Sequence, residues 1–182
     1  MTNPATMRIK VLDIVVEVVL HGDADEMAQL LGPAWARCMA AGNAEVDAHI
    51  DVRLDSAATP RRSHDSVIAP SADAAMELLT QAITLVGITA GAGSLLMFHA
   101  AGLVELSSKR SVLLVGPSGI GKSTAARHLG REWGYLSDET VAVREDGSVI
   151  AYPKPLSLRL GGRWKRQVGP DALGLMDVEG VV

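Results

Sequence analysis

The sequence predicts an α/β protein built around a mixed sheet. Apolar segments of strand length alternate with segments of helical periodicity along the 182 residues. A glycine-rich loop joins one of these strands to a helix, an arrangement that places ligands at the carboxyl ends of strands. The connections within residues 95–115 are too short for parallel crossovers, so some neighbouring strands must be antiparallel.

The composition is that of a globular protein with a sizeable core. The chain is 48% hydrophobic and 21% charged, and its length suits one domain or a domain with a small extra lobe. The net charge is −4 and the basic clusters are short, so no nucleic-acid partner is predicted. The single cysteine, Cys38, cannot form an internal disulfide, and we therefore expect a cytoplasmic protein.

Residues 1–70 are predicted to form a small N-terminal α/β segment. Residues 7–20 alternate like one half-buried strand, whose apolar face is Leu12, Ile14, Val16, Val18 and Leu20. Asp13 and Glu17 interrupt this run, which argues against an export signal. The elements expected next are a helix over 25–39, a strand over 48–54 and an exposed polar loop over 55–66. The segment is either a separate lobe or an extension of the main sheet.

A helical pattern begins at Ser71, a suitable N-cap. Its apolar stripe is Met76, Leu79, Ile83, Val86 and Ala90. Residues 78–98 carry no charge and are long enough to span a bilayer. Gln81, three threonines and the sequence GAGS divide this run, so we predict a buried helix followed by an apolar strand. A membrane-associated component is the alternative.

Residues 71–182 are predicted to form the main domain. The strands expected after the first helix cover 95–100, 103–106, 111–115, 135–136, 141–144 and 148–152, with a helix over 122–133. Gly102 separates the first two strands, and the apolar run SVLLV at 111–115 is typical of a central strand. The sequence EDGS predicts a hairpin between the last two strands.

The sequence LLVGPSGIGKSTAARHL contains the pattern G-x-x-x-x-G-K-[ST] between an apolar strand and an amphipathic helix. Glycines let successive backbone N–H groups point at phosphate oxygens, and the helix adds its positive N-terminus. Lys122 would contact the β- and γ-phosphates, and the Ser123 hydroxyl would bind Mg²⁺. The predicted ATP- or GTP-binding residues are Gly116, Pro117, Ser118, Gly119, Ile120, Gly121, Lys122, Ser123 and Thr124.

The loop lies between two other segments, in the order MFHAAGLVEL, SVLLVGPSGIGKST, GYLSDETVAV. This order resembles the catalytic domain of the HPr kinase/phosphorylase family, which is related in fold to phosphoenolpyruvate carboxykinase. The resemblance covers roughly residues 71–160. It implies a mixed-sheet P-loop core in which His99 precedes the loop and Asp138 and Glu139 follow it. It also implies phosphorylation of a hydroxyl with Mg²⁺ and ATP as cofactors, the acceptor being a serine of a protein or peptide.

The resemblance implies a role for each acidic residue. Asp138 would be the base that accepts the proton of the attacking hydroxyl, and Glu139, with Asp138 and Ser123, would bind the metal. The plainer interpretation is that the two carboxylates only mark a turn. His99 either contacts a phosphate, orients a carboxylate, or is a hydrogen-bonded core residue. Lys154 and Arg159 could stabilise phosphoryl transfer, although solvated surface charge is the commoner explanation, and His128 is expected to be structural.

The chain also departs from the family. It has no counterpart of the glycine-rich signature segment and basic substrate loop of full-length bacterial members, so we expect a C-terminally incomplete chain or a divergent branch with another substrate. For the same reason the reverse, phosphate-removing activity is not expected. The alternative function is an ATP-binding regulator that switches without transferring phosphate. The oligomeric state is left open, a homo-oligomer included.

Overall fold

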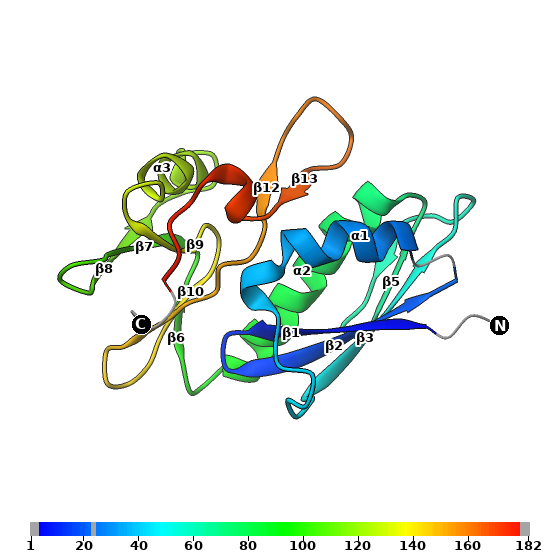
Figure 1. The fold of residues 1–182 in the computed structure, drawn as a ribbon, viewed down its shortest axis with the longest axis horizontal. Coiled ribbons are helices and arrows are strands. Elements are labelled where there is room, and N and C mark those ends of the chain that lie inside the picture. The colour runs from blue at the N-terminus through cyan, green and yellow to red at the C-terminus, as the bar shows by residue number, and fades with distance from the viewer. Residues whose placement is uncertain (1–3, 23–24, 179–182) are drawn as a thin grey trace.

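The computed structural model describes residues 4–22 and 25–178 and has a mixed α/β architecture with several sheets (Figure 1). The predicted α/β class is therefore confirmed. The N-terminal elements are β1 (Ala5–Val11), β2 (Ile14–His21), α1 (Asp25–Ala34), a 3₁₀ turn (Ala36–Cys38), β3 (Ala48–Leu54), β4 (Arg61–Arg62), β5 (Ser66–Ala69) and α2 (Ala72–Gly91). The later elements are β6 (Leu96–Phe98), β7 (Ala100–Glu105), β8 (Arg110–Val115), α3 (Lys122–Leu129), β9 (Gly134–Ser137), β10 (Val141–Val143), β11 (Val149–Ile150), β12 (Leu156–Leu158), β13 (Arg166–Val168) and a 3₁₀ turn (Asp171–Leu173).

The first sheet has the strand order β1-β2-β3-β5-β4, with α1 and α2 packed on one side (Figure 1). β2 is parallel to β3 and β3 to β5, whereas the outer pairs β1/β2 and β4/β5 are antiparallel. Buried positions alternate with exposed ones in β3 and with half-buried ones in β2, so one face of the sheet supplies the core. This N-terminal sheet is therefore mixed, whereas the mixed directions predicted around residues 95–115 are not found, because the described strand pairs there are all antiparallel.

The single strand expected over residues 7–20 is wrong, because the chain reverses at Leu12 and Asp13. Val11 pairs with Ile14 across this two-residue turn, and Leu12 adopts a positive φ of 53°. Leu12 is nevertheless buried. The apolar alternation changes phase at this turn, because the buried side chains lie at odd positions before it (Ile9 and Val11) and at even positions from Leu12 onward. The single-strand expectation overlooked this shift.

Three other expectations for the N-terminal segment have different outcomes. The strand over 48–54 is confirmed with the same bounds. The helix expected over 25–39 ends at Ala34, one residue after Pro33, and continues only as a short 3₁₀ turn. The loop over 55–66 is largely exposed, but it contains β4, which pairs with β5.

Helix α2 is the long helix at the centre of the main core (Figure 1). Ser71 is its N-cap, as predicted, and its Oγ accepts a hydrogen bond from the Ala74 N–H at 3.3 Å. The expected apolar stripe is buried at Met76, Leu79 and Ile83, half-buried at Val86 and exposed at Ala90. Among the described residues, α2 alone is long and apolar enough to cross a membrane, and 56% of its most apolar window is buried inside the protein.

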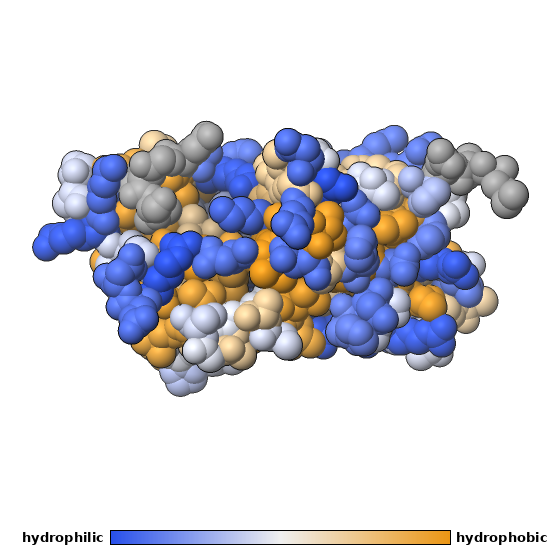
Figure 2. Space-filling model, turned by 90° about the horizontal axis from the view of Figure 1, so that it is seen from below, coloured by the Kyte–Doolittle hydropathy of each residue, from blue (hydrophilic) through white to orange (hydrophobic). Residues whose placement is uncertain are grey.

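Figure 2, which views the molecule from below, shows hydrophobic side chains gathered in the middle of this face between hydrophilic ones. The core that contains α2 also includes Ala142, Ile150 and Tyr152 from the second half of the chain. Helix α2 therefore joins the two halves, and the domain boundary at residue 70 stays a prediction.

The sheet that carries the glycine-rich loop has the order β8-β7-β9, and both pairs are antiparallel. β8, expected as a central strand, is therefore an edge strand, and Val115 at its end is 67% exposed. The expected break between two strands at Gly102 is also wrong. Gly102 lies inside β7, and the two strands are separated at His99 instead. A glycine is needed at 102 because a Cβ there would lie 2.8 Å from Cγ2 of Val141.

The remaining elements follow the sequence more closely. β10 and β11 form the predicted hairpin, with Gly147 in its turn at a φ of +86°. α3 begins at Lys122 as expected but ends at Leu129, four residues before the expected end at Trp133. Residues beyond Pro153, which carry no clear pattern, form a second hairpin from β12 and β13.

Candidate functional site

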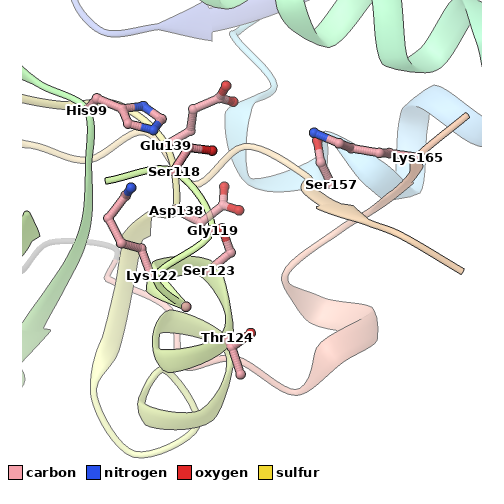
Figure 3. A pocket seen from close by; sticks show the side chains of 11 residues that line it. His99, Ser118, Gly119, Lys122, Ser123, Thr124, Asp138, Glu139, Ser157 and Lys165 are labelled. Carbon is pink, nitrogen blue, oxygen red and sulfur yellow. The ribbon is translucent and has the colours of Figure 1, made fainter. Parts of the chain in front are cut away.

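Segments that are distant in the sequence meet at one cavity of about 340 Å³ (Figure 3). They are the glycine-rich loop, the junction between β6 and β7, the acidic pair after β9, and the β12–β13 hairpin. The lining residues are His99, Ser118, Gly119, Gly121, Lys122, Ser123, Thr124, Asp138, Glu139, Ser157 and Lys165. Of the predicted nucleotide-binding residues, Gly116, Pro117 and Ile120 belong to the loop but do not line this cavity.

The glycine-rich loop lies between the end of β8 and the start of α3, the strand-to-helix position expected from the sequence. Gly119 and Gly121 have φ values of +83° and +102°, which only glycine adopts without strain. Nζ of Lys122 donates hydrogen bonds to the carbonyl oxygens of Gly116 (2.7 Å) and Pro117 (3.1 Å). The lysine thus folds back over the loop, and among the described residues its ammonium is bound only by neutral carbonyl groups.

The loop and helix fit a phosphate chain. Gly121 is the N-cap of α3 and provides no side-chain cap, so the N–H groups of the first helical turn are not used by a capping side chain. These groups, the helix dipole and the Lys122 ammonium all favour anionic oxygens. Ser123 and Thr124 lie in the same first turn and line the cavity.

The acidic pair is held by a buried lysine. Nζ of Lys154 lies 3.1 Å from Oδ1 of Asp138 and 3.0 Å from Oε2 of Glu139, and it also donates to the Pro155 carbonyl oxygen at 3.1 Å. The Lys154 side chain is fully buried and that of Asp138 is 4% exposed, whereas that of Glu139 is 43% exposed. All three protons of the ammonium therefore have acceptors.

The two carboxylates keep Lys154 charged. Burial alone would lower the pKa of its ammonium, but the negative charges of Asp138 and Glu139 outweigh burial and raise the pKa above its ordinary value. The solvated surface charge expected for Lys154 is therefore wrong. Arg159, considered together with it, is exposed and does not line the cavity.

Tyr135 also donates a hydrogen bond to the Asp138 carboxylate. Its hydroxyl lies 3.2 Å from Oδ1 of Asp138 and 3.3 Å from the Lys154 carbonyl oxygen. Burial and the charge of Asp138 raise the pKa of Tyr135 well above its ordinary value, so the hydroxyl remains a donor. Oδ1 of Asp138 thus receives bonds from Tyr135 and Lys154. Among the described residues nothing bonds to Oδ2, which leaves that oxygen for a ligand.

His99 lies at the junction between β6 and β7 and is exposed, so it is not a buried core residue. The neighbouring Ala100 N–H donates to the Glu139 carbonyl oxygen at 3.2 Å, which brings the strand junction next to the acidic pair. Figure 3 shows the imidazole on the same side of the cavity as Glu139 and Lys122. His128, expected to be structural, is exposed on α3 and does not line the cavity.

A metal ion would need ligands beyond the protein. No group of three or more His, Cys, Asp or Glu side chains in the described part of the chain is placed to hold one. Ser123, Asp138 and Glu139, the predicted metal ligands, all line the cavity, but Lys154 is bound to both carboxylates. A Mg²⁺ ion at this cavity would therefore have to take most of its oxygen ligands from nucleotide phosphates and water.

Sequence reasoning missed three residues of this site. Tyr135 carried no signal beyond its place in a strand, and Ser157 and Lys165 lie on a hairpin that has no clear strand pattern. A buried lysine next to two carboxylates cannot be found from spacing, because Lys154 is separated from them by two strands. A scan against protein-family models finds no match to the chain, and a search of curated proteins finds no significant relative.

Proposed function

We propose that this chain is an ATP-dependent phosphotransferase with a core of the HPr kinase type, which transfers the γ-phosphoryl group to a serine hydroxyl of a protein or peptide. The observation that carries the proposal is the shared cavity: the glycine-rich loop, His99 and the Asp138–Glu139 pair line one space although they come from separate segments. Phosphoryl transfer needs phosphate ligands and a proton acceptor side by side, and this cavity offers both.

The reaction assigned to the site is an in-line displacement. The acceptor oxygen forms a bond to the γ-phosphorus, the bond from that phosphorus to the bridging oxygen breaks, and ADP leaves. Oδ2 of Asp138 takes the proton of the attacking hydroxyl. Mg²⁺-ATP, when bound, supplies the phosphoryl group and the metal charge that neutralises its oxygens.

The other residues hold this arrangement. Lys122 exchanges its carbonyl partners in the loop for phosphate oxygens, a better match for an ammonium. Lys154 and Tyr135 bind Oδ1 of Asp138 and so direct Oδ2 at the ligand. Glu139, which is partly exposed, would offer a carboxylate oxygen to a metal bound with the nucleotide.

One observation favours a second function, an ATP-dependent switch without transfer. Asp138 is already neutralised by a buried lysine, as in a purely structural ion pair. In that case nucleotide binding at the loop would move a neighbouring element, and no acceptor would be modified.

Asp138→Asn separates the two functions because it keeps the shape of the side chain and removes its basicity. The wild type and this variant are incubated with labelled ATP and Mg²⁺ in a lysate of the source cells, and labelled proteins are identified by mass spectrometry. For a kinase, labelling falls by at least about 100-fold, which is the usual contribution of a general base. Glu139→Gln is the matched control at the neighbouring carboxylate and should weaken metal dependence more than it abolishes transfer.

Lys122→Ala tests the phosphate site itself. It should lose most nucleotide binding and transfer, and an unchanged rate would refute the assignment of the loop. Binding of ATP without any labelled acceptor in the wild type would favour the switch.

A further inference from the structure

The β12–β13 hairpin forms the wall of the cavity opposite the glycine-rich loop. Ser157 on β12 and Lys165, just before β13, line the cavity from this side. Figure 3 shows both side chains on the hairpin, across the cavity from Asp138 and Ser123. The cavity thus has a second wall that the nucleotide site does not use.

This wall is anchored to the rest of the protein. The Lys165 N–H donates to Oε2 of Glu77 on α2 at 2.7 Å, and Trp164 packs against the main core. Across the hairpin, Ser157 Oγ donates to Oε1 of Gln167 at 2.9 Å. The backbone that carries Lys165 is therefore held in place, as a specific binding residue requires.

In the described part of the chain, the ammonium of Lys165 forms no ion pair with a carboxylate. The acidic pair in the cavity is already bound to Lys154. Its half-buried side chain lines the cavity with an unneutralised charge. A charge of this kind favours an anionic ligand.

The loop of the hairpin extends this positive charge outward. Residues 159–166, with the sequence RLGGRWKR, hold four basic residues and no acidic one, although the whole chain has a net charge of −4. Arg159, Arg163 and Arg166 are exposed, and the Arg163 guanidinium lies 5.2 Å from the centre of the Trp164 ring. The hairpin therefore concentrates positive charge next to the cavity, which its Lys165 lines.

We propose that Lys165 and this basic loop bind an acidic segment of the phosphate acceptor, with Asp or Glu side chains close to the hydroxyl that is modified. The inference rests on the proposed phosphotransferase function and names its substrate class. The nucleotide phosphates have Lys122 and the α3 N-terminus on the opposite wall, so the hairpin charge is left for the acceptor. Opposite charge across such an interface mainly determines partner choice and association rate.

Two synthetic peptides of equal length test the inference: one has a central serine flanked by aspartates, and the other has asparagines in their place. Binding of each labelled peptide is measured by fluorescence anisotropy with Mg²⁺ and a non-hydrolysable ATP analogue. Transfer from ATP and binding of the analogue are measured separately. The wild type should bind the aspartate peptide about tenfold more tightly, and this preference should weaken with salt.

Lys165→Glu should remove the preference for the aspartate peptide without changing binding of the ATP analogue. A third peptide, in which lysines flank the serine, should bind to the Lys165→Glu variant. Lys10→Glu is the matched control, because Lys10 is exposed on β1 in the first sheet, and it should behave like the wild type. The melting temperature of each variant checks that it is folded.

Four results would overturn the inference: equal binding of the two peptides, no binding of either, weaker analogue binding in Lys165→Glu, or equal competition by an oligonucleotide of the same charge. If the protein prefers the aspartate peptide but transfers no phosphate, the binding site for an acidic segment is supported and the phosphotransferase function is refuted. If it transfers phosphate without that preference, the phosphotransferase function is supported and the binding site for an acidic segment is refuted.

Discussion

Lys154→Met removes the buried ammonium that joins Asp138 to Glu139, and it should both destabilise the protein and stop phosphoryl transfer. The replacement is similar in length and apolar, so it fills the space and leaves the two carboxylates without their cation. Glu139 is partly exposed and can turn to solvent, but Asp138 cannot. The loss of stability therefore comes mainly from the Asp138 carboxylate, which stays buried without its cation.

The magnitude follows from the distances. At an effective dielectric constant of about 20, two unit charges 3.1 Å apart, the distance from Lys154 to Asp138, attract each other by roughly 5 kcal/mol. Desolvation offsets much of this attraction, and loss of one partner of a buried ion pair usually costs about 3–5 kcal/mol. For a chain of this size that corresponds to a fall in melting temperature of roughly 6–20 °C.

The contribution of Lys154 to stability should depend on pH in a definite direction. The pKa of Lys154 is raised, so in the wild type its ammonium contributes stability throughout the range below its unfolded pKa and loses it only in strong alkali. The stability gap between variant and wild type should therefore persist from pH 5 to pH 8 and narrow only in strong alkali.

Urea denaturation from pH 5 to 8 measures the gap, and labelled ATP measures transfer. Lys154→Arg keeps the charge and should lose less stability, whereas Lys10→Met removes an exposed lysine and should change little. The double variant Lys154→Met/Asp138→Asn removes both buried charges and should recover much of the stability while remaining inactive. A Lys154→Met protein with wild-type stability at pH 8 and a wild-type rate would refute the role given to this lysine.

Three further predictions follow from the packing. Burial raises the pKa of the Cys38 thiol to about 12, so this residue should react with Ellman's reagent only in denaturant; rapid reaction in the native state would contradict its burial. A Cβ at Gly87 of α2 would lie 2.4 Å from Cγ2 of Val11, so Gly87→Ala should lower the free energy of unfolding by about 1–3 kcal/mol despite the better helix propensity of alanine. Gly42, which has open space around it, provides the control, and equal unfolding free energies for the two alanine variants would argue against the close packing of α2. Ser71→Ala should cost about 1 kcal/mol in the same denaturation experiment, since the N-cap bond to the Ala74 N–H is lost, and no loss would mean that the cap is not formed.

Features that depend on neighbouring residues could be predicted from the sequence. The Ser71 N-cap, the strand over 48–54, the EDGS hairpin and the strand-loop-helix order around Lys122 all have the expected form. Each depends on hydrogen bonds or periodicity within a few residues, so the local sequence contains the necessary information. The turn at Leu12 was missed although the buried apolar positions shift there from odd (Ile9 and Val11) to even numbers.

The candidate site was predicted as a set of residues but not as an arrangement. The sequence by itself determined the glycine-rich loop and pointed to His99, Asp138 and Glu139. Only the tertiary structure decided that β8 is an edge strand, that Lys154 is buried between two carboxylates, and that Lys165 lines the cavity. The physical reason is that strand order, burial and ion pairing depend on residues far apart in the chain, and no spacing in the sequence encodes which of these will meet.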